Sequence, residues 1–380
     1  MTPLPLRIGI VCYPTFGGSG VVATELGKSL AKQGHEVHFI TYNLPVRLGS
    51  FHPRVFYHEV EVSKYPLFDY PPYELVLTSK MVDVVKAHNL DLLHVHYAIP
   101  HASAAVNAKR ILAKAGKDLP VVTTLHGTDI TLLGNDASFH PVISDAIEES
   151  DVVTAVSHHL KAVTRSVFGE SLDIQVVHNF VCPHHFDLPP NEEFRQELSS
   201  DGAPILCHIS NFRPVKRVCD VVDMFHMVRS SRKAKLLMVG DGPDRQAAEE
   251  RARTHGIGED VIFLGKVKNP IEALLISDLL VLPSETESFG LVALEAFAAG
   301  VPVVSSNTGG LPEVNLQDST GQLRPVGDVA GMAQDALHIL EESIHPTFKE
   351  AALKRAAEFQ MENIVSQYLA LYKKALQPST

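Results

Sequence analysis

Short apolar runs alternate with segments of helical length along the first half of the chain. Runs rich in Val, Ile and Leu predict five strands, at Leu6–Cys12, Glu36–Thr41, Asp91–His94, Pro120–Leu125 and Asp151–Val156. Helices are expected between them, at Val21–Gln33, Tyr73–His88 and Ala102–Ala115. Continuously apolar strands that alternate with helices are typical of a parallel sheet covered on both faces. This half therefore predicts a doubly wound α/β domain.

The second half repeats the same rhythm. Strands are predicted at Pro204–Ile209, Lys235–Val239, Val261–Leu264, Asp278–Leu282 and Val301–Ser305, and helices near Val218–Arg229, Asp244–His255, Phe289–Ala299 and Val329–Glu341. The polar, proline-containing stretch Cys182–Pro204 predicts a linker. The pattern indicates two Rossmann-like doubly wound domains, 1–180 and 181–358, that face a cleft where ligands bind beyond the strand ends. An amphipathic tail, 359–376, is expected to form a helix that packs back on the first domain.

Composition and charge exclude several classes of protein. The 380 residues include 33 Lys and Arg against 44 Asp and Glu, a formal charge of −11, which argues against binding nucleic acid. The longest apolar neighbourhood, Leu291–Ser305, is interrupted and falls short of the ~20 residues that span a membrane, so no membrane association is expected. No secretory signal is expected either, because the run Ile8–Cys12 is too short for a signal core. Four cysteines without CxxC spacing fit reduced thiols in a cytoplasmic protein.

Glycines follow the first predicted strand. The run Gly17-Gly18-Ser19-Gly20 opens the first helix, where backbone amides can meet a phosphate or a carboxylate. The alternative is a tight turn needed only for packing. A dinucleotide site would require G-x-G-x-x-G and an acid after the second strand, which instead ends at Thr41-Tyr42-Asn43. NAD is therefore not expected.

Twenty histidines raise the possibility of a metal, but HExxH and other ligand spacings are absent from the sequence. We expect His94, His96 and the adjacent pairs His158-His159 and His184-His185 to be core or surface residues. No catalytic metal and no cofactor are predicted. His126 differs, because a titratable ring at the carboxyl end of a strand can face a ligand; the alternative is a turn-capping histidine.

Two segments of the second domain favour an anionic ligand. Ser210–Arg217 follows a predicted strand and holds three cations within five residues, at a helix start where the dipole disfavours them. The segment Glu285–Ala296 follows another strand and becomes helical near Gly290. The amides of Gly290, Leu291 and Val292 would then be unpaired donors for phosphate or sugar oxygens. Glu295, inside an apolar helix, would accept from a hydroxyl pair or form a structural ion pair.

Taken together, these residues resemble the retaining family-4 glycosyltransferases of the GT-B fold, over nearly the full length of the chain. Glu287 and Glu295 match the E-x7-E motif of that family. The segments Val239-Gly240-Asp241-Gly242-Pro243 and Gly309-Gly310-Leu311-Pro312-Glu313 are similar to family motifs as well. The resemblance implies transfer with a retained α-anomeric product, no required metal, and a homodimer.

The resemblance also implies roles for individual residues. His126 and Glu287 would be catalytic, lying beside the donor sugar. The donor would be bound by Gly17, Gly18, Asn211, Arg213, Lys216, Ser288, Phe289, Gly290, Leu291, Val292 and Glu295. Asn211 stands where the family usually has an arginine, and Asn179-Phe180-Val181-Cys182 replaces its N-G-V-D.

Further motifs are similar to one subgroup, whose members transfer N-acetylglucosamine from UDP-GlcNAc to the hydroxyl of L-malate in the first step of bacillithiol biosynthesis. They are 12–20, His96-Tyr97-Ala98-Ile99-Pro100-His101 and Thr123–Asp129. Malate carries two carboxylates, and candidates to hold it are Ser19, Arg47, Tyr97 and Thr128. The alternatives are a family-4 transferase with another small, lipid or glycan acceptor, a GT-B UDP-GlcNAc epimerase, and a non-catalytic sensor of the sugar nucleotide.

Overall fold

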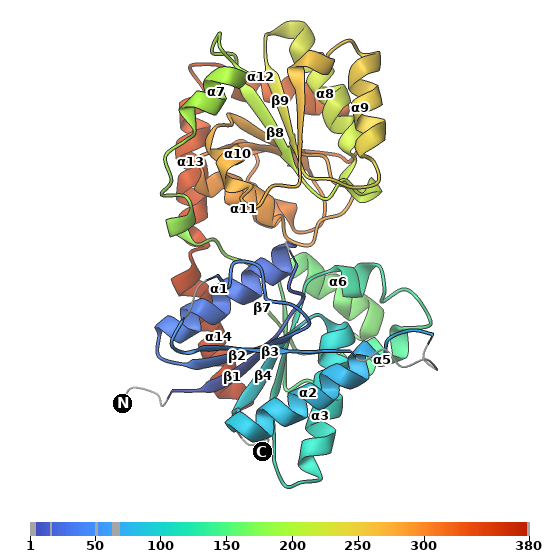
Figure 1. The fold of residues 1–380 in the computed structure, drawn as a ribbon. Helices are drawn as coiled ribbons and strands as arrows, with labels where there is room; N and C mark the ends of the chain where they lie inside the picture. Colours follow the sequence, from blue (N-terminus) through green and yellow to red (C-terminus); the bar gives the residue numbers. More distant parts are fainter. Residues whose placement is uncertain (1–4, 16, 50–51, 63–68, 378–380) are drawn as a thin grey trace. The chain divides into compact units, whose positions relative to one another are not determined.

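A computed structural model describes residues 5–15, 17–49, 52–62 and 69–377. The chain forms two compact units (Figure 1): unit 1 comprises Met1–Asn179 and Met361–Thr380, and unit 2 comprises Phe180–Gln360. The chain therefore leaves unit 1, completes unit 2 and returns to unit 1 for its last helix. None of the described helices is both long and apolar enough to cross a membrane.

Unit 1 is built on a parallel sheet of seven strands in the order β3-β2-β1-β4-β5-β6-β7. The strands are β1 (Arg7–Val11), β2 (Glu36–Thr41), β3 (Val55–Glu59), β4 (Leu92–His96), β5 (Val121–Leu125), β6 (Val152–Ala155) and β7 (Ile174–Val176). The helices are α1 (Gly18–Lys32), α2 (Tyr73–His88), α3 (Ser103–Ala113), α4 (Thr128–Thr131), α5 (His140–Glu148), α6 (His158–Phe168) and α14 (Met361–Ala375).

Successive side chains along each strand point to opposite faces of the sheet, so unit 1 has two separate cores, one on each face. On one face, Ile40 and Leu93 join an apolar cluster with α2 and α3. On the other face, Phe39 lies against α1, where a Cβ added to Gly27 would come within 2.5 Å of its ring. Helix α14 covers this second face, and its Tyr372 hydroxyl lies 2.7 Å from Nδ1 of His94 on β4. A segment from the far end of the chain thus completes the core of unit 1.

Unit 2 is built on a parallel sheet of six strands in the order β10-β9-β8-β11-β12-β13. The strands are β8 (Ile205–Ile209), β9 (Lys235–Val239), β10 (Val261–Gly265), β11 (Leu279–Leu282), β12 (Val303–Ser306) and β13 (Gly321–Arg324). The helices are α7 (Glu192–Leu198), α8 (Val218–Ser231), α9 (Arg245–Thr254), α10 (Ile271–Leu275), α11 (Leu291–Ala298), α12 (Val329–Ile339) and α13 (His345–Glu358). Helices α8 and α12 pack on an apolar cluster that includes Phe225, Leu236 and Met332.

The predicted fold class is confirmed: both units are doubly wound, Rossmann-like α/β structures. The prediction of a linker at Cys182–Pro204 is wrong over part of its length, because α7 lies within it. The side chain of Asn191 caps this helix by accepting from the amide of Phe194, and acidic residues fill its first turn. These local signals outweigh the neighbouring prolines.

Candidate functional site

The strand order of each unit reverses at one place. In unit 1 the reversal lies between β1 and β4, and in unit 2 it lies between β8 and β11. Loops that leave neighbouring strands in opposite directions open a crevice at such a point, and ligands of doubly wound sheets bind there. The loops that follow these four strands carry most of the residues predicted from the sequence.

At the reversal of unit 1, two residues predicted to hold the acceptor are in contact. The hydroxyl of Tyr97 donates to Oγ of Ser19 over 3.1 Å. Tyr97 has a φ of 83°, a left-handed conformation that a bulky residue adopts only where its surroundings impose it. Burial raises the pKa of the Tyr97 hydroxyl to about 12, so the group stays protonated and can donate. The pair offers two hydroxyls, one from the first turn of α1 and one from the loop after β4.

His126 follows β5 and is held by a second histidine. Its Nε2 lies 2.8 Å from Nδ1 of His96, and its ring centroid lies 5.1 Å from that of Tyr97. Burial, together with the nearby His101, lowers the pKa of His126 to about 3. The sequence predicted a titratable ring here, but the structure makes it a neutral one at physiological pH. Such a ring can orient a ligand by hydrogen bonding without carrying charge.

The histidines around His126 form a buried network. The rings of His94 and His96 stack 4.5 Å apart, and Nε2 of His94 lies 2.8 Å from the hydroxyl of Thr124. His94 and His96 are fully buried, as the sequence led us to expect of core histidines. The network fixes the position of His126 from within the core.

Asp129 lies beside the predicted site residues, and no role of its own was predicted for it. Its carboxylate is 1% exposed and accepts from the backbone amides of Ala98 at 2.9 Å and Gly127 at 3.0 Å. It therefore joins the loop after β4 to the loop after β5. Burial raises its pKa, while the amide hydrogen bonds lower it. A carboxylate three residues after His126 was the available signal.

Four other predicted residues of unit 1 lie in loops or at helix starts. Gly17 and Gly18 are exposed at the start of α1, and Thr128 is exposed at the start of α4. Arg47 lies in the loop after β2, with a φ of 66°, and its carbonyl accepts from Nζ of Lys28 at 3.3 Å. The structure thus places Arg47 beside α1.

At the reversal of unit 2, two predicted donor-binding residues form an ion pair. Nζ of Lys216 lies 2.5 Å from Oε2 of Glu287, and each side chain is 21% exposed. A backbone bond links the same two loops, since the amide of Glu285 donates to the carbonyl of Val215 over 2.8 Å. The cation and the carboxylate are therefore positioned together, at the carboxyl ends of β8 and β11.

Glycine loops support both of these segments. A Cβ on Gly309, where φ is +58°, would lie 1.8 Å from the carbonyl oxygen of Glu287. The amide of Gly310 donates to that same carbonyl over 2.8 Å. A Cβ on Gly240, where φ is +125°, would lie 1.8 Å from the carbonyl oxygen of Ser210. Only glycine permits such close approach, so the glycine motifs position the loops that carry Glu287 and Ser210.

The sequence predicted an anion site at the start of α11. Gly290 precedes the helix with a φ of 96°, and Leu291 and Val292 form its first turn. The first amides of a helix lack partners within the helix and favour an anion. Phe289 is 2% exposed, and its ring centroid lies 5.9 Å from that of Phe359. Glu295 is 8% exposed within the same helix.

The three cations of the basic loop after β8, Arg213, Lys216 and Arg217, have different surroundings. Asn211 and Arg213 are exposed, and Phe212 between them is buried with a φ of 42°. Nε of Arg217 donates to Oδ2 of Asp220 over 2.7 Å, so this arginine is already paired. Ser288 is half-buried beside Glu287.

Comparison with known proteins establishes the class. Residues 16–185 match the family described as Glycosyltransferase Family 4, and residues 190–358 match the family described as Glycosyl transferases group 1. The chain superposes on sucrose-phosphate synthase from Thermosynechococcus elongatus with a TM-score of 0.78 and 22% identity, covering 98% of this chain and 100% of that one. It superposes on Anabaena Alr3699/HepE in complex with UDP and glucose with a TM-score of 0.79 and 20% identity, covering 97% and 99% of the two chains.

The chain belongs to glycosyltransferase family 4 and has the GT-B fold. It is 49% identical over 376 residues to the N-acetyl-alpha-D-glucosaminyl L-malate synthase of Bacillus anthracis, covering 98% of each sequence. The predicted family, fold and glycosyltransferase class are confirmed. The individual site residues stay predictions.

Proposed function

We propose that this glycosyltransferase moves N-acetylglucosamine from UDP-GlcNAc to the hydroxyl of L-malate, with retention at the anomeric carbon. The observation that carries the proposal is the 49% identity, over 98% of both sequences, to a protein named for this synthesis. Formation of the malate glycoside would supply the first intermediate of bacillithiol biosynthesis.

The donor would bind to the loops of unit 2. Lys216 would bind the diphosphate, together with the first amides of α11 and the exposed Arg213. Glu287 would accept from the sugar hydroxyls, and Glu295 from the ribose. As the bond to the diphosphate breaks, negative charge grows on the leaving group, and a cation and aligned amides stabilise it without a metal. His126, neutral because it is buried, would hydrogen-bond to the sugar rather than transfer a proton.

The acceptor would bind to the loops of unit 1. The Ser19–Tyr97 pair, joined over 3.1 Å, and Thr128 supply hydroxyls for a carboxylate. Arg47 would pair with the second carboxylate of malate, since charge-assisted hydrogen bonds are the strongest available for it. Unit 1 would therefore bind the acceptor and, through His126, Gly17 and Gly18, also contact the donor.

Two finer features of the proposal rest on indirect support. The cysteines Cys12, Cys182, Cys207 and Cys219 are free thiols, which suits a reducing compartment such as the cytoplasm. The homodimer rests on family resemblance alone and can be tested by the mass of the protein in solution.

The decisive experiment measures release of UDP from UDP-GlcNAc by purified protein, with and without L-malate, in buffer containing a chelator. We expect malate-dependent release, a product with the mass of N-acetylhexosaminyl-malate, and an α-anomeric proton signal in its NMR spectrum. If UDP release does not depend on malate but increases with another hydroxyl compound, that compound is the acceptor and the proposed acceptor is wrong. If the sugar nucleotide is converted to its epimer without any acceptor, the protein is an epimerase and the proposed transfer reaction is wrong.

A further inference from the structure

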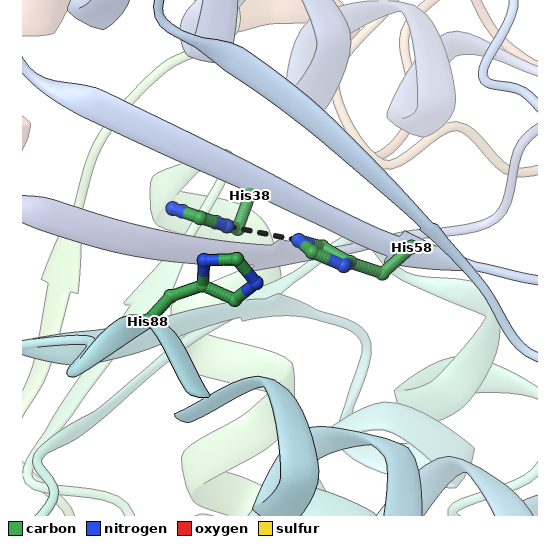
Figure 2. A group of neighbouring side chains, drawn as sticks. All are labelled: His38, His58 and His88. Atoms are coloured by element: carbon green, nitrogen blue, oxygen red, sulfur yellow. Dashed lines mark hydrogen bonds between the residues drawn. The ribbon is translucent and has the colours of Figure 1, made fainter. Parts of the chain in front are cut away.

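Three histidines gather on the face of the unit 1 sheet that α2 covers (Figure 2). His38 comes from β2, His58 from β3, and His88 is the last residue of α2. Nδ1 of His38 lies 2.9 Å from Nε2 of His58, and one ring nitrogen of each histidine lies within 4.8 Å of the other two. Three imidazoles from three elements therefore converge on one point.

The fold explains this convergence. In the parallel pairing of β2 with β3, His38 lies opposite Phe56, and Ile40 lies opposite His58. The two histidines therefore share one sheet face and are offset by two positions. Helix α2 ends at His88 because Asn89 turns left-handed, with a φ of 50°. The ring of His88 then lies 4.6 Å from that of His38 and 4.9 Å from that of His58.

A carboxylate orients the first of these rings. Nε2 of His38 lies 2.9 Å from Oε1 of Glu36. Because a carboxylate accepts, the proton of His38 resides on Nε2 and the lone pair of Nδ1 faces the other histidines. A carboxylate behind a histidine is the usual arrangement in protein metal sites, where it fixes the tautomer and strengthens the ligand.

The electrostatic surroundings favour neutral rings at His38 and His58. Burial lowers the pKa of His38, and burial together with the neighbouring histidines lowers that of His58 to about 4. Neutral imidazoles bind metal ions without first losing a charge-bearing proton. Arg7 and Lys80 are the cations that act on these two rings, and they oppose a bound ion. Glu36 and the carbonyl end of α2 favour one.

We propose that His38, His58 and His88 bind one zinc-like divalent transition-metal ion. Nδ1 of His38, Nε2 of His58 and one nitrogen of His88 would be the ligands, and water would complete a tetrahedron. Ligand nitrogens about 2 Å from Zn²⁺ lie about 3.3 Å apart. The 2.9 Å between His38 and His58 would therefore open by a few tenths of an ångström, while the His58 proton moves from Nε2 to Nδ1 through solvent.

The position of the cluster indicates what the ion would do. His38 lies in the first half of β2, toward the amino ends of the strands, whereas Ser19, Tyr97 and His126 follow the carboxyl ends. The ion would tie the edge strand β3 to β2 and to the end of α2. Its role would be to stabilise the edge of unit 1, and transferase activity should not depend on it.

The test uses the full chain, freed of any affinity tag and stripped of metal by a chelator. Zn²⁺ is titrated by calorimetry into wild type, His88→Gln and the control His140→Gln, which removes a histidine of α5. We expect one ion per wild-type chain, unchanged binding in His140→Gln, and at least a ~100-fold loss of affinity in His88→Gln. Glu36→Gln should lose about 10-fold. Co²⁺ in place of Zn²⁺ should give visible absorption typical of tetrahedral coordination in wild type and in His140→Gln, but not in His88→Gln.

Thermal unfolding provides a second readout. Zn²⁺ should raise the Tm of wild type and of His140→Gln, and leave that of His88→Gln unchanged. His88 ends a helix, so without metal its variant should have the circular dichroism and the Tm of wild type. The proposal is overturned if wild type binds no stoichiometric Zn²⁺, or if His88→Gln binds it as tightly as wild type.

Discussion

Nζ of Lys216 and Oε2 of Glu287 lie 2.5 Å apart, although the two residues follow strands β8 and β11 that are distant in sequence. The pair keeps both charges partnered before a ligand arrives. A nucleotide sugar offers each residue a different partner, because its diphosphate attracts the ammonium and its hydroxyls donate to the carboxylate. Binding of the donor would therefore exchange one internal contact for two contacts with the ligand.

Replacing Lys216 tests the diphosphate contact. Lys216→Ala should lower kcat/KM by about 10²- to 10³-fold, because the cation acts most strongly on charge that develops in the transition state. The measurement is steady-state UDP release at varied UDP-GlcNAc. Lys233→Ala is the matched control, since Nζ of Lys233 pairs with Asp201 at 2.9 Å on the surface of the same unit. If the two variants are equally active, Lys216 does not bind the donor.

Gly309 is expected to position Glu287. Gly309→Ala would force its Cβ against the Glu287 carbonyl, so we expect at least a ~10-fold rise in the KM for UDP-GlcNAc. The control is Gly256→Ala, where φ is +69° and a new Cβ would meet nothing within 4 Å. That control should cost only about 1 kcal/mol of stability, from backbone strain, and leave KM unchanged. A Gly309→Ala enzyme with normal KM would show that the loop tolerates displacement.

Arg47 tests the acceptor site. Arg47→Ala should raise the KM for L-malate by about 10- to 100-fold, the cost of losing a hydrogen bond to a charged group, while the KM for UDP-GlcNAc changes little. Arg54→Ala, at an exposed position shortly before β3, is the control. If the malate KM of Arg47→Ala equals that of Arg54→Ala, the carboxylate site lies elsewhere.

The buried histidines predict that unit 1 loses stability in acid. Burial lowers the pKa to about 3 for His94 and His126 and to about 4 for His101, against about 6.5 in the unfolded chain. Below pH 6.5 the unfolded chain therefore binds protons that the folded chain rejects. Stability is fully present above that pH and falls as the pH drops toward about 4, by about 1.4 kcal/mol per pH unit for each histidine.

Urea unfolding measured from about pH 7 to about pH 4 checks this prediction. The midpoint should decrease steadily below pH 6.5, and His140→Gln should leave that decrease unchanged, because its ring lies outside the buried network. A midpoint that stays constant over this range would mean that the histidines titrate normally.

The sequence predicted the central elements better than the edges of the sheets. The helix expected at Tyr73–His88 has those bounds, and the predicted strands Glu36–Thr41 and Lys235–Val239 do as well. Strands β3, β7 and β13 were missed because edge and short strands lack a continuous apolar run. In β3, for example, Phe56 is 39% exposed. A continuous apolar run indicates a strand that is buried on both faces of the sheet, and an edge strand is less buried than a central one.

Some features of the candidate site could likewise be predicted from the sequence, and others could not. Residues that share a loop or a motif, such as Glu287 and Glu295, could be chosen from spacing and family resemblance. The contacts of Lys216 with Glu287, and of Ser19 with Tyr97, depend on how strands far apart in sequence become neighbours. The cluster of His38, His58 and His88 could not be predicted from the sequence for the same reason. Its members are 20 and 30 residues apart and form no ligand motif.

Helix α14 has a consequence for how the protein is made. Tyr368 and Tyr372 of this helix are buried against His94 and Thr124, in the middle of the unit 1 sheet. A ribosome delivers α14 only after all of unit 2 has been synthesised. Until then, unit 1 lacks the helix that covers one face of its sheet, and Nδ1 of His94 lacks its Tyr372 partner. Unit 1 can therefore complete its fold only after unit 2 has been synthesised, and the incomplete unit 1 is the state that a chaperone would have to protect.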